Sequence, residues 1–309
     1  MRELIEIYNV EDLERVISIK PTLNQLFKVV YNNQNLTDEF KLLIVEYINN
    51  LLEKYPNTNL TALYFNVKDL KVITDDKMKE QGIFSSIGDY IKLLPKDNYY
   101  NEQYYKSTVF HELTHATRII QAYYGTDYRP FFYGFNNKDK YLYIEEALNE
   151  LFSYSVLKSD IIKSYQASIE YVEILLDAIE EYSLEDYMNK GVAYLIELLY
   201  QKTSDKKTAD ILVMINEIVG KLEKDSPIDI EYYKIVYEYI AKLHLLAKSD
   251  NIKRKDDDIK IITSLMSRLS VAHNSLSQSI RIMEILYDYY MENWDKYVLS
   301  DSKQKRKKH

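Results

Sequence analysis

The chain has 309 residues, of which 46% are apolar and 28% are charged, a composition typical of a globular protein with a sizeable core. The formal net charge of −8 argues against a general nucleic-acid-binding surface, and the absence of cysteine excludes both a disulfide framework and a thiolate site. Only 6 glycines and 5 prolines interrupt the chain, so long helices are favoured over a sheet-rich fold with many tight turns.

The N-terminal segment carries acidic and basic residues throughout and lacks the uninterrupted apolar run of a signal peptide. No segment reaches the ~18 uncharged apolar residues that a membrane span needs. We therefore expect a cytoplasmic protein without a membrane partner.

Residues 1–56 are predicted to be helical, because apolar residues recur there at three- and four-residue spacing up to Pro56. The pattern then changes. Residues 59–67 and 70–74 are rich in β-forming residues, and we expect two strands joined as a hairpin. Residues 89–95 predict a third short strand.

A helix is predicted from about Tyr104 to about Tyr124, followed by a loop that contains Gly125, Pro130 and Gly134. A second helix is expected from near Lys140, and only helical patterns follow between residues 160 and 300, before a basic tail. The expected fold class is α+β and predominantly helical, with a small β-sheet near the middle of the chain. The expected regions are an N-terminal helical region (1–56), a central core (57–160) and a C-terminal helical region (161–309).

The central motif is His-Glu-Leu-Thr-His, from His111 to His115. On a helix, residues four apart share one face, so both imidazoles can bind the same metal ion. Glu112 lies about 100° around the helix from His111, where it can act as a general base on a water molecule. The alternative is an ordinary helix whose two histidines are hydrogen-bonded in the core.

A catalytic zinc ion needs a third protein ligand. The metzincin pattern, with a further histidine six residues after the second, is excluded because Arg118 and Gln121 stand where its glycine and histidine would be. Glu146 and Glu150 are four residues apart on the next predicted helix, so one could bind the metal and the other could support a ligating imidazole.

Two other carboxylates remain candidates for the third ligand. Glu145 is the immediate neighbour of Glu146 on the same predicted helix. Asp127 lies in the predicted loop, within a Gly-Thr-Asp sequence like that of aspartate-liganded zincins but with different spacing.

The motif resembles that of the gluzincins, the thermolysin-type zinc peptidases, and residues 146–150 are similar to their Glu-x-x-x-acid helix. Residues 85–158 are also similar to the C-terminal zincin-like metallopeptidase domain of ArdC-type antirestriction proteins. The shared sequence features are a short strand that ends in Pro95, the pair Tyr104-Tyr105, the histidine helix and a Glu-Glu-x-x-x-Glu helix. The N-terminal single-strand DNA-binding region of those proteins has no recognisable counterpart here, so no nucleic-acid partner is expected.

The resemblance implies a zinc-dependent metallopeptidase that acts on a peptide or protein substrate. Zn²⁺ would be held by His111, His115 and Glu146, with Glu150 supporting His111 and Glu112 as the general base. Residues 89–95 would form the edge strand against which an extended peptide binds. Candidates for the donor that stabilises the oxyanion are Arg118, Tyr133, Tyr143 and Tyr154.

A second hypothesis is a non-catalytic binding or interaction protein of a phage or mobile element, built on a zincin scaffold. The presence of Glu112 favours catalysis, because a purely structural metal site gains nothing from a general base. The sequence leaves the oligomeric state undetermined.

Overall fold

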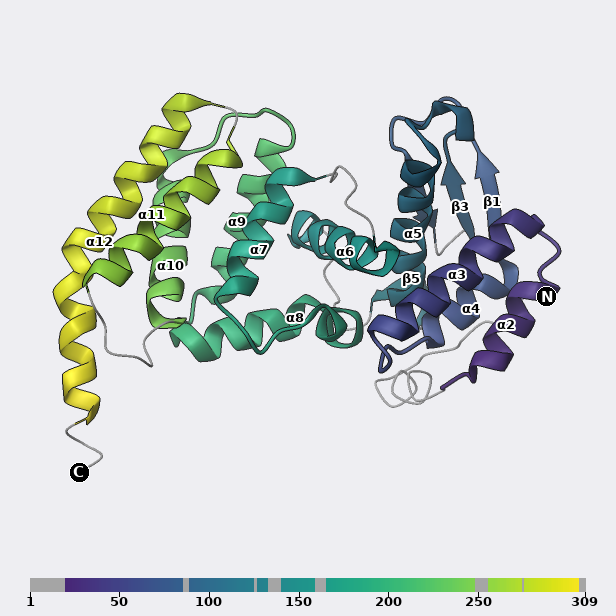
Figure 1. Cartoon of the computed structure of the whole chain (residues 1–309), viewed down its shortest axis with the longest axis horizontal. Coiled ribbons are helices and arrows are strands. Elements are labelled where there is room, and N and C mark those ends of the chain that lie inside the picture. Colours follow the sequence, from purple (N-terminus) through teal and green to yellow (C-terminus); the bar gives the residue numbers. More distant parts are fainter. Residues whose placement is uncertain are drawn as a thin grey trace. The chain divides into compact units, whose positions relative to one another are not determined.

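The computed structural model describes residues 20–85, 89–124, 127–132, 140–158, 165–247, 255–273 and 275–305. The expected class is confirmed, since the chain is predominantly helical and carries small β-sheets (Figure 1). The chain divides into two compact units, which are described separately. The first comprises Met1–Asn136, Leu148–Ser164 and Ser183–Tyr194, and the second comprises Asn137–Ala147, Tyr165–Tyr182 and Leu195–His309.

Within the described residues up to Arg118, the first unit contains four α-helices, and polar residues cap the starts of three of them. They are α2 (Leu23–Asn32), α3 (Asp38–Lys54), α4 (Thr61–Asp69) and α5 (Glu102–Arg118). Thr22 and Gln25 form a reciprocal capping box at α2, while Thr37 and Asn101 accept backbone N–H groups at the starts of α3 and α5. These caps satisfy N–H groups that have no partner within the helix. A short 3-10 helix, η1 (Lys96–Asn98), precedes α5.

Helix α4 replaces the first strand of the predicted hairpin, so that prediction was wrong. Only the second segment is extended, as β1 (Lys71–Thr74). Within α4, Leu63 and Val67 are fully buried one turn apart, and Asn66 donates to the carbonyls of Ala116 and Ile119 at 2.7 and 2.6 Å. Burial of this helical face against α5 overrides the β-propensity of the segment.

A three-stranded sheet lies beside α5, in the order β1-β3-β2, with β2 at Gly82–Ser85 and β3 at Tyr90–Leu93. Strand β3 is parallel to β1 and antiparallel to β2. The predicted strand at residues 89–95 therefore exists, but it is the central strand and not an edge. Ile91 and Leu93 are buried and alternate with partly exposed residues, so one face of β3 packs against the core. The edge strand next to α5 is β2.

Helix α5 ends at Arg118, so the predicted helix end near Tyr124 was wrong. The prediction that a loop follows this helix was also wrong. An antiparallel hairpin follows, formed by β4 (Ile119–Tyr124) and β5 (Asp127–Phe132). The β-branched pair at positions 119 and 120 favours this change to strand. Pro130 is tolerated because a two-stranded sheet consists of edge strands only. Gly125 and Gly134 lie outside the described residues.

The remaining described helices match the expectation that only helical segments follow residue 160. Helix α6 (Leu142–Leu157) contributes to both units, as does α8 (Leu184–Thr203), which contains a kink at Gly191 with φ 67°. In the second unit, α10 contacts α9, α11 and α12, and α7 contacts α9 and α11 (Figure 1). The bounds of these helices are α7 Gln166–Asp177, α9 Thr208–Leu222, α10 Ile230–Ala247, α11 Lys255–Val271 and α12 Leu276–Lys305.

The core of the second unit contains several buried tyrosines and both of its described histidines. The hydroxyls of Tyr171 and Tyr237 are 2.6 Å apart, and each lies 3.1 Å from Nε2 of His273. His244 contacts the carbonyl of Ile174 at 2.8 Å. These two histidines are therefore packing residues. None of the helices in the described part of the chain has the length and apolar character needed to cross a membrane.

Candidate metal centre

Helix α5 is anchored to the first unit on the side opposite its histidines. Val109, Phe110 and Leu113 are fully buried. The hydroxyl of Tyr47, from α3, lies 3.2 Å from Oγ1 of Thr114 and 3.1 Å from Oγ1 of Thr117. These contacts fix the rotation of α5 about its axis, so the histidines are presented on its remaining face.

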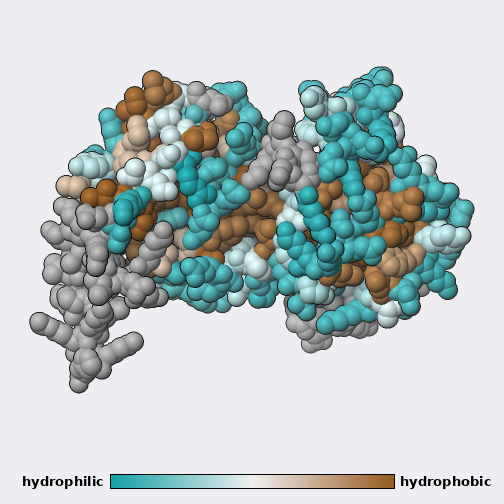
Figure 2. Space-filling model, in the orientation of Figure 1, coloured by the Kyte–Doolittle hydropathy of each residue, from teal (hydrophilic) through white to brown (hydrophobic). Residues whose placement is uncertain are grey.

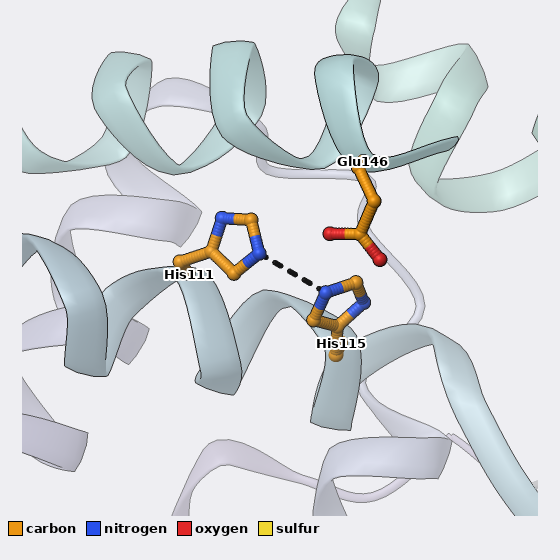
Figure 3. Close-up of side chains that lie close together, drawn as sticks. All are labelled: His111, His115 and Glu146. Atoms are coloured by element: carbon orange, nitrogen blue, oxygen red, sulfur yellow. Dashed lines mark hydrogen bonds between the residues drawn. The ribbon is translucent and has the colours of Figure 1, made fainter. Parts of the chain in front are cut away.

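His111, His115 and Glu146 come together as a three-residue group. Their nearest ligand atoms all lie within 4.8 Å of one another, and the Nε2 atoms of the two histidines are 3.1 Å apart. Figure 3 shows both imidazoles rising from α5 toward the carboxylate of Glu146, which comes from α6. Across the described part of the chain, this is the one group of His, Cys, Asp or Glu residues with such convergence.

The second glutamate of α6 contacts the first histidine from behind. The Glu150 carboxylate is hydrogen-bonded to Nδ1 of His111, and the two side chains are only 5% and 12% exposed. A carboxylate accepts, so Nδ1 carries the proton and the lone pair of a neutral His111 is on Nε2, toward His115 and Glu146. The amide of Asn149 also donates to the main-chain carbonyl of His111, at 3.1 Å. Helix α6 thus holds both the ring and the backbone of His111.

These residues fit a divalent metal ion. Two nitrogens at about 2.0–2.1 Å from one ion, at a tetrahedral angle, lie roughly 3.3–3.4 Å apart. The observed separation of 3.1 Å between the two Nε2 atoms is close to that value. Two imidazoles and one carboxylate are a donor set used for zinc and related transition metals. The group can therefore bind a metal ion, and the Glu150 contact is of the kind that orients ligating histidines in metal sites.

Glu112 lies next to the group but points toward the sheet. Its side chain is buried, and Gly82 of β2 packs directly against it. A Cβ atom added at Gly82 would lie 2.7 Å from Oε1 of Glu112 and 2.7 Å from Cγ2 of Thr108. Only glycine lets β2 approach α5 this closely. Burial raises the pKa of Tyr99, and the Glu112 carboxylate adds to that shift, so Tyr99 belongs to the same surroundings.

Gly82 and Tyr99 were not among the site residues predicted from the sequence. An isolated glycine within a short β-forming run was the one available signal, because such glycines often mark a close backbone approach. For Tyr99 there was no signal among the 31 tyrosines of the chain.

The alternative third ligands are placed differently. Glu145 is buried but is not part of the metal-binding group, since neighbouring helical positions point about 100° apart. Asp127 begins β5, and its side chain lies outside the described part of the structure.

The candidate oxyanion donors are scattered. The buried guanidinium of Arg118 lies 3.8 Å from the ring centroid of Tyr187, an arrangement typical of a cation–π contact. The ring of Tyr143 packs on Gly220 in the second unit, and Tyr154 is buried. Tyr133 lies outside the described residues. None of these observations selects one donor.

Comparison with known proteins gives no relative: no protein-family model, curated protein or solved structure matches the chain. The resemblance to gluzincins and to ArdC-type domains therefore stays a hypothesis that rests on the motif residues themselves.

Proposed function

We propose that the protein is a zinc-dependent metallopeptidase. The observation that carries the proposal is the convergence of His111, His115 and Glu146 within 4.8 Å, with Glu112 next to the first ligand in the sequence. A His-Glu-x-x-His helix supplies both ligands and base from two turns of one element. The carboxylate from α6 completes the three protein ligands that catalytic zinc sites use.

In this proposal, separate residues of the chain accept the proton and orient the metal ligands. A bound zinc ion supplies Lewis-acid polarisation of a carbonyl and increases the acidity of water. Glu112 accepts a proton from the attacking water and delivers it to the leaving amine nitrogen. Glu150 keeps the proton of His111 on Nδ1, so that Nε2 stays available as a ligand. The Asn149 side-chain amide donates a hydrogen bond to the main-chain carbonyl of His111 and so holds its backbone in place.

The proposed substrate is an extended peptide. In the three-stranded sheet, β2 pairs with β3 on one side only, and it contacts the helix that carries Glu112. An extended peptide could add to the other edge of β2 through backbone hydrogen bonds. Strand β2 thus takes the role that the sequence analysis gave to residues 89–95.

One observation favours the second hypothesis, a metal site without catalysis. Glu112 is 4% exposed, with Gly82 packed on it, whereas a general base must reach a water molecule and a substrate. In that case the metal would join α5 to α6 and stabilise a binding protein. Catalysis remains the better-supported function, because Glu112 has no role in a purely structural site.

The test compares metal content and peptide cleavage in matched variants. Wild-type protein should hold about one zinc ion per chain by elemental analysis and cleave members of a mixed peptide library in a chelator-sensitive manner. His115→Ala and Glu146→Ala should lose most of the metal and the cleavage. Glu145→Ala removes the carboxylate next to Glu146 and should retain both the bound metal and the peptide cleavage. Metal retained at the wild-type level in His115→Ala would exclude this site.

A further inference from the structure

Residues 75–82, which lead from β1 into β2, form a strap that ends on Glu112. Gly82 is the first residue of β2, and a Cβ atom there would lie 2.7 Å from both Oε1 of Glu112 and Cγ2 of Thr108. Tyr104, Thr108 and Glu112 are four residues apart on α5, so their side chains share one face of the helix. The end of the strap therefore lies on the face that carries the proposed base.

The side chain of Gln81 joins the strap to this face of α5. Its amide donates to the hydroxyl of Tyr104 at 2.8 Å, and its side-chain oxygen lies 3.5 Å from Oγ1 of Thr108. The main-chain carbonyl of Gln81 accepts from the hydroxyl of Tyr99 at 2.5 Å and from the backbone N–H of Leu94 at 3.2 Å. Gln81 thus fixes the strap directly before the glycine that packs on the proposed base.

The rest of the strap is polar and buries little apolar surface. Its exposed residues include Asp76, Lys77, Lys79 and Glu80. Figure 2 shows mostly hydrophilic residues at this end of the first unit, next to the labelled strands β1 and β3 of Figure 1. Gly82 forms the last pair of the β2–β3 ladder, with Leu93. Segments with few buried apolar contacts open locally at low free energy, so the strap can detach while α5 and the rest of the sheet stay folded.

The covered position of Glu112 conflicts with its proposed role. Its side chain is 4% exposed, whereas a general base must reach a water molecule and the leaving nitrogen of a substrate. We propose that the strap makes an autoinhibitory contact, which covers Glu112 while Gln81 is bound to α5 and uncovers it when that contact opens. This inference rests on the proposed peptidase function and assigns a regulation to the same site.

The direction of the change in activity separates this role from a supporting one. If Gly82 and Gln81 held Glu112 in its productive position, weakening the strap would lower the rate of cleavage. If the strap blocks Glu112, weakening it raises the rate, because a larger fraction of the protein is open.

Two substitutions that weaken the strap test its role. Gln81→Ala removes both side-chain contacts with α5, and Tyr104→Phe removes the acceptor of the Gln81 amide. Each should raise the initial rate of chelator-sensitive cleavage of a mixed peptide library by roughly 2–10-fold, the factor that matches the net loss of one hydrogen bond. Zinc content should not change. Tyr105→Phe alters the adjacent tyrosine, keeps the Gln81 contacts and should leave the rate at the wild-type value.

Hydrogen exchange of the zinc-loaded, full-length protein follows the strap without any cleavage. Read by mass spectrometry, peptides that cover residues 75–85 should exchange faster in Gln81→Ala and Tyr104→Phe than in the wild type or Tyr105→Phe. Peptides that cover residues 109–118 of α5 should exchange at the wild-type rate in all four proteins, which shows that the helix stays folded.

The combined results separate the strap from the proposed function. Unchanged exchange of residues 75–85 in both variants would overturn the strap, as would faster exchange with equal or lower cleavage. In either case, wild-type cleavage that Glu112→Gln abolishes would leave the peptidase standing. Faster exchange without cleavage by any of these zinc-loaded proteins would instead overturn the peptidase, and with it the inhibitory role of the strap.

Discussion

The contact between Gly82 and Glu112 allows the packing of the proposed general base to be tested independently of any substrate. In Gly82→Ala, the new methyl group would lie 2.7 Å from both Glu112 Oε1 and Thr108 Cγ2, and 3.0 Å from Glu112 Cγ. These separations are below ordinary van der Waals contact, so β2, Glu112 or both must move. Because β2 is held by main-chain pairing to β3, we expect Glu112 to be displaced.

Overpacking by a methyl group costs typically ~1–3 kcal/mol of unfolding free energy. At about 2–4 °C per kcal/mol for a chain of this size, the melting temperature of the first unit should fall by about 2–12 °C. Replacing Glu112 by Ala removes two of the three crowded atoms, and Thr108→Ser removes the third. Gly82→Ala should therefore lower the unfolding free energy less in the Glu112→Ala or Thr108→Ser variant than in the wild type. The difference, measured as the coupling energy of a double-mutant cycle, should be at least ~0.5 kcal/mol.

The assay is chemical denaturation of the single and combined variants. The matched control is Gly220→Ala in the second unit, where a Cβ would lie 2.3 Å from Cε2 of Tyr143. Gly220→Ala should lower the unfolding free energy by the same amount with and without Glu112→Ala. If the losses of unfolding free energy caused by Gly82→Ala and Glu112→Ala were strictly additive, the contact would be refuted. It would also be refuted if Gly220→Ala showed the same coupling energy with Glu112→Ala.

Three further predictions address other parts of the molecule. Burial lowers the pKa of His273 from 6.5 to about 4, so the unfolded chain takes up the proton first on acidification. The unfolding free energy should thus be unaffected above pH 6.5 and fall by up to ~3 kcal/mol between pH 6.5 and 4, and His273→Gln should lose this dependence in denaturant titrations. Glu150→Ala should weaken zinc binding by ~10–100-fold in competition with a chelator, because His111 loses its carboxylate partner. Tyr47→Phe should lower the unfolding free energy by about 1 kcal/mol, since two buried threonines of α5 lose a hydrogen-bond partner; an unchanged value would show that this hydroxyl does not anchor the helix.

The two histidines could be placed from the sequence because their geometry is local. Residues four apart on one helix face the same way whatever the rest of the chain does. The position of Glu146 depends on how α6 docks against α5, and the sequence offered only the four-residue spacing to Glu150 and the resemblance to gluzincins and ArdC-type domains. The structure brings Glu146 to the histidines and Glu150 to the back of His111.

The strand predictions failed where tertiary packing outweighs local preference. Residues 61–69 contain good β-formers, yet they are helical because Leu63, Asn66 and Val67 are buried together against α5. The strand order β1-β3-β2 could not be derived, since strands of four residues carry too little pattern to distinguish a centre from an edge. For the same reason the approach of Gly82 to Glu112 could not be foreseen.

Glu112 is proposed as the general base of a zinc peptidase, and the substitution Glu112→Gln tests this role. The substitution keeps the size and hydrogen-bonding capacity of the side chain but removes its basicity. Zinc content and melting temperature should stay at wild-type values, while chelator-sensitive cleavage of a mixed peptide library, followed by mass spectrometry, should fall by ~10²–10⁴-fold. Equal cleavage by wild type and Glu112→Gln would contradict the assignment of Glu112, and zinc-loaded wild type that cleaves neither peptides nor proteins would favour the structural metal site.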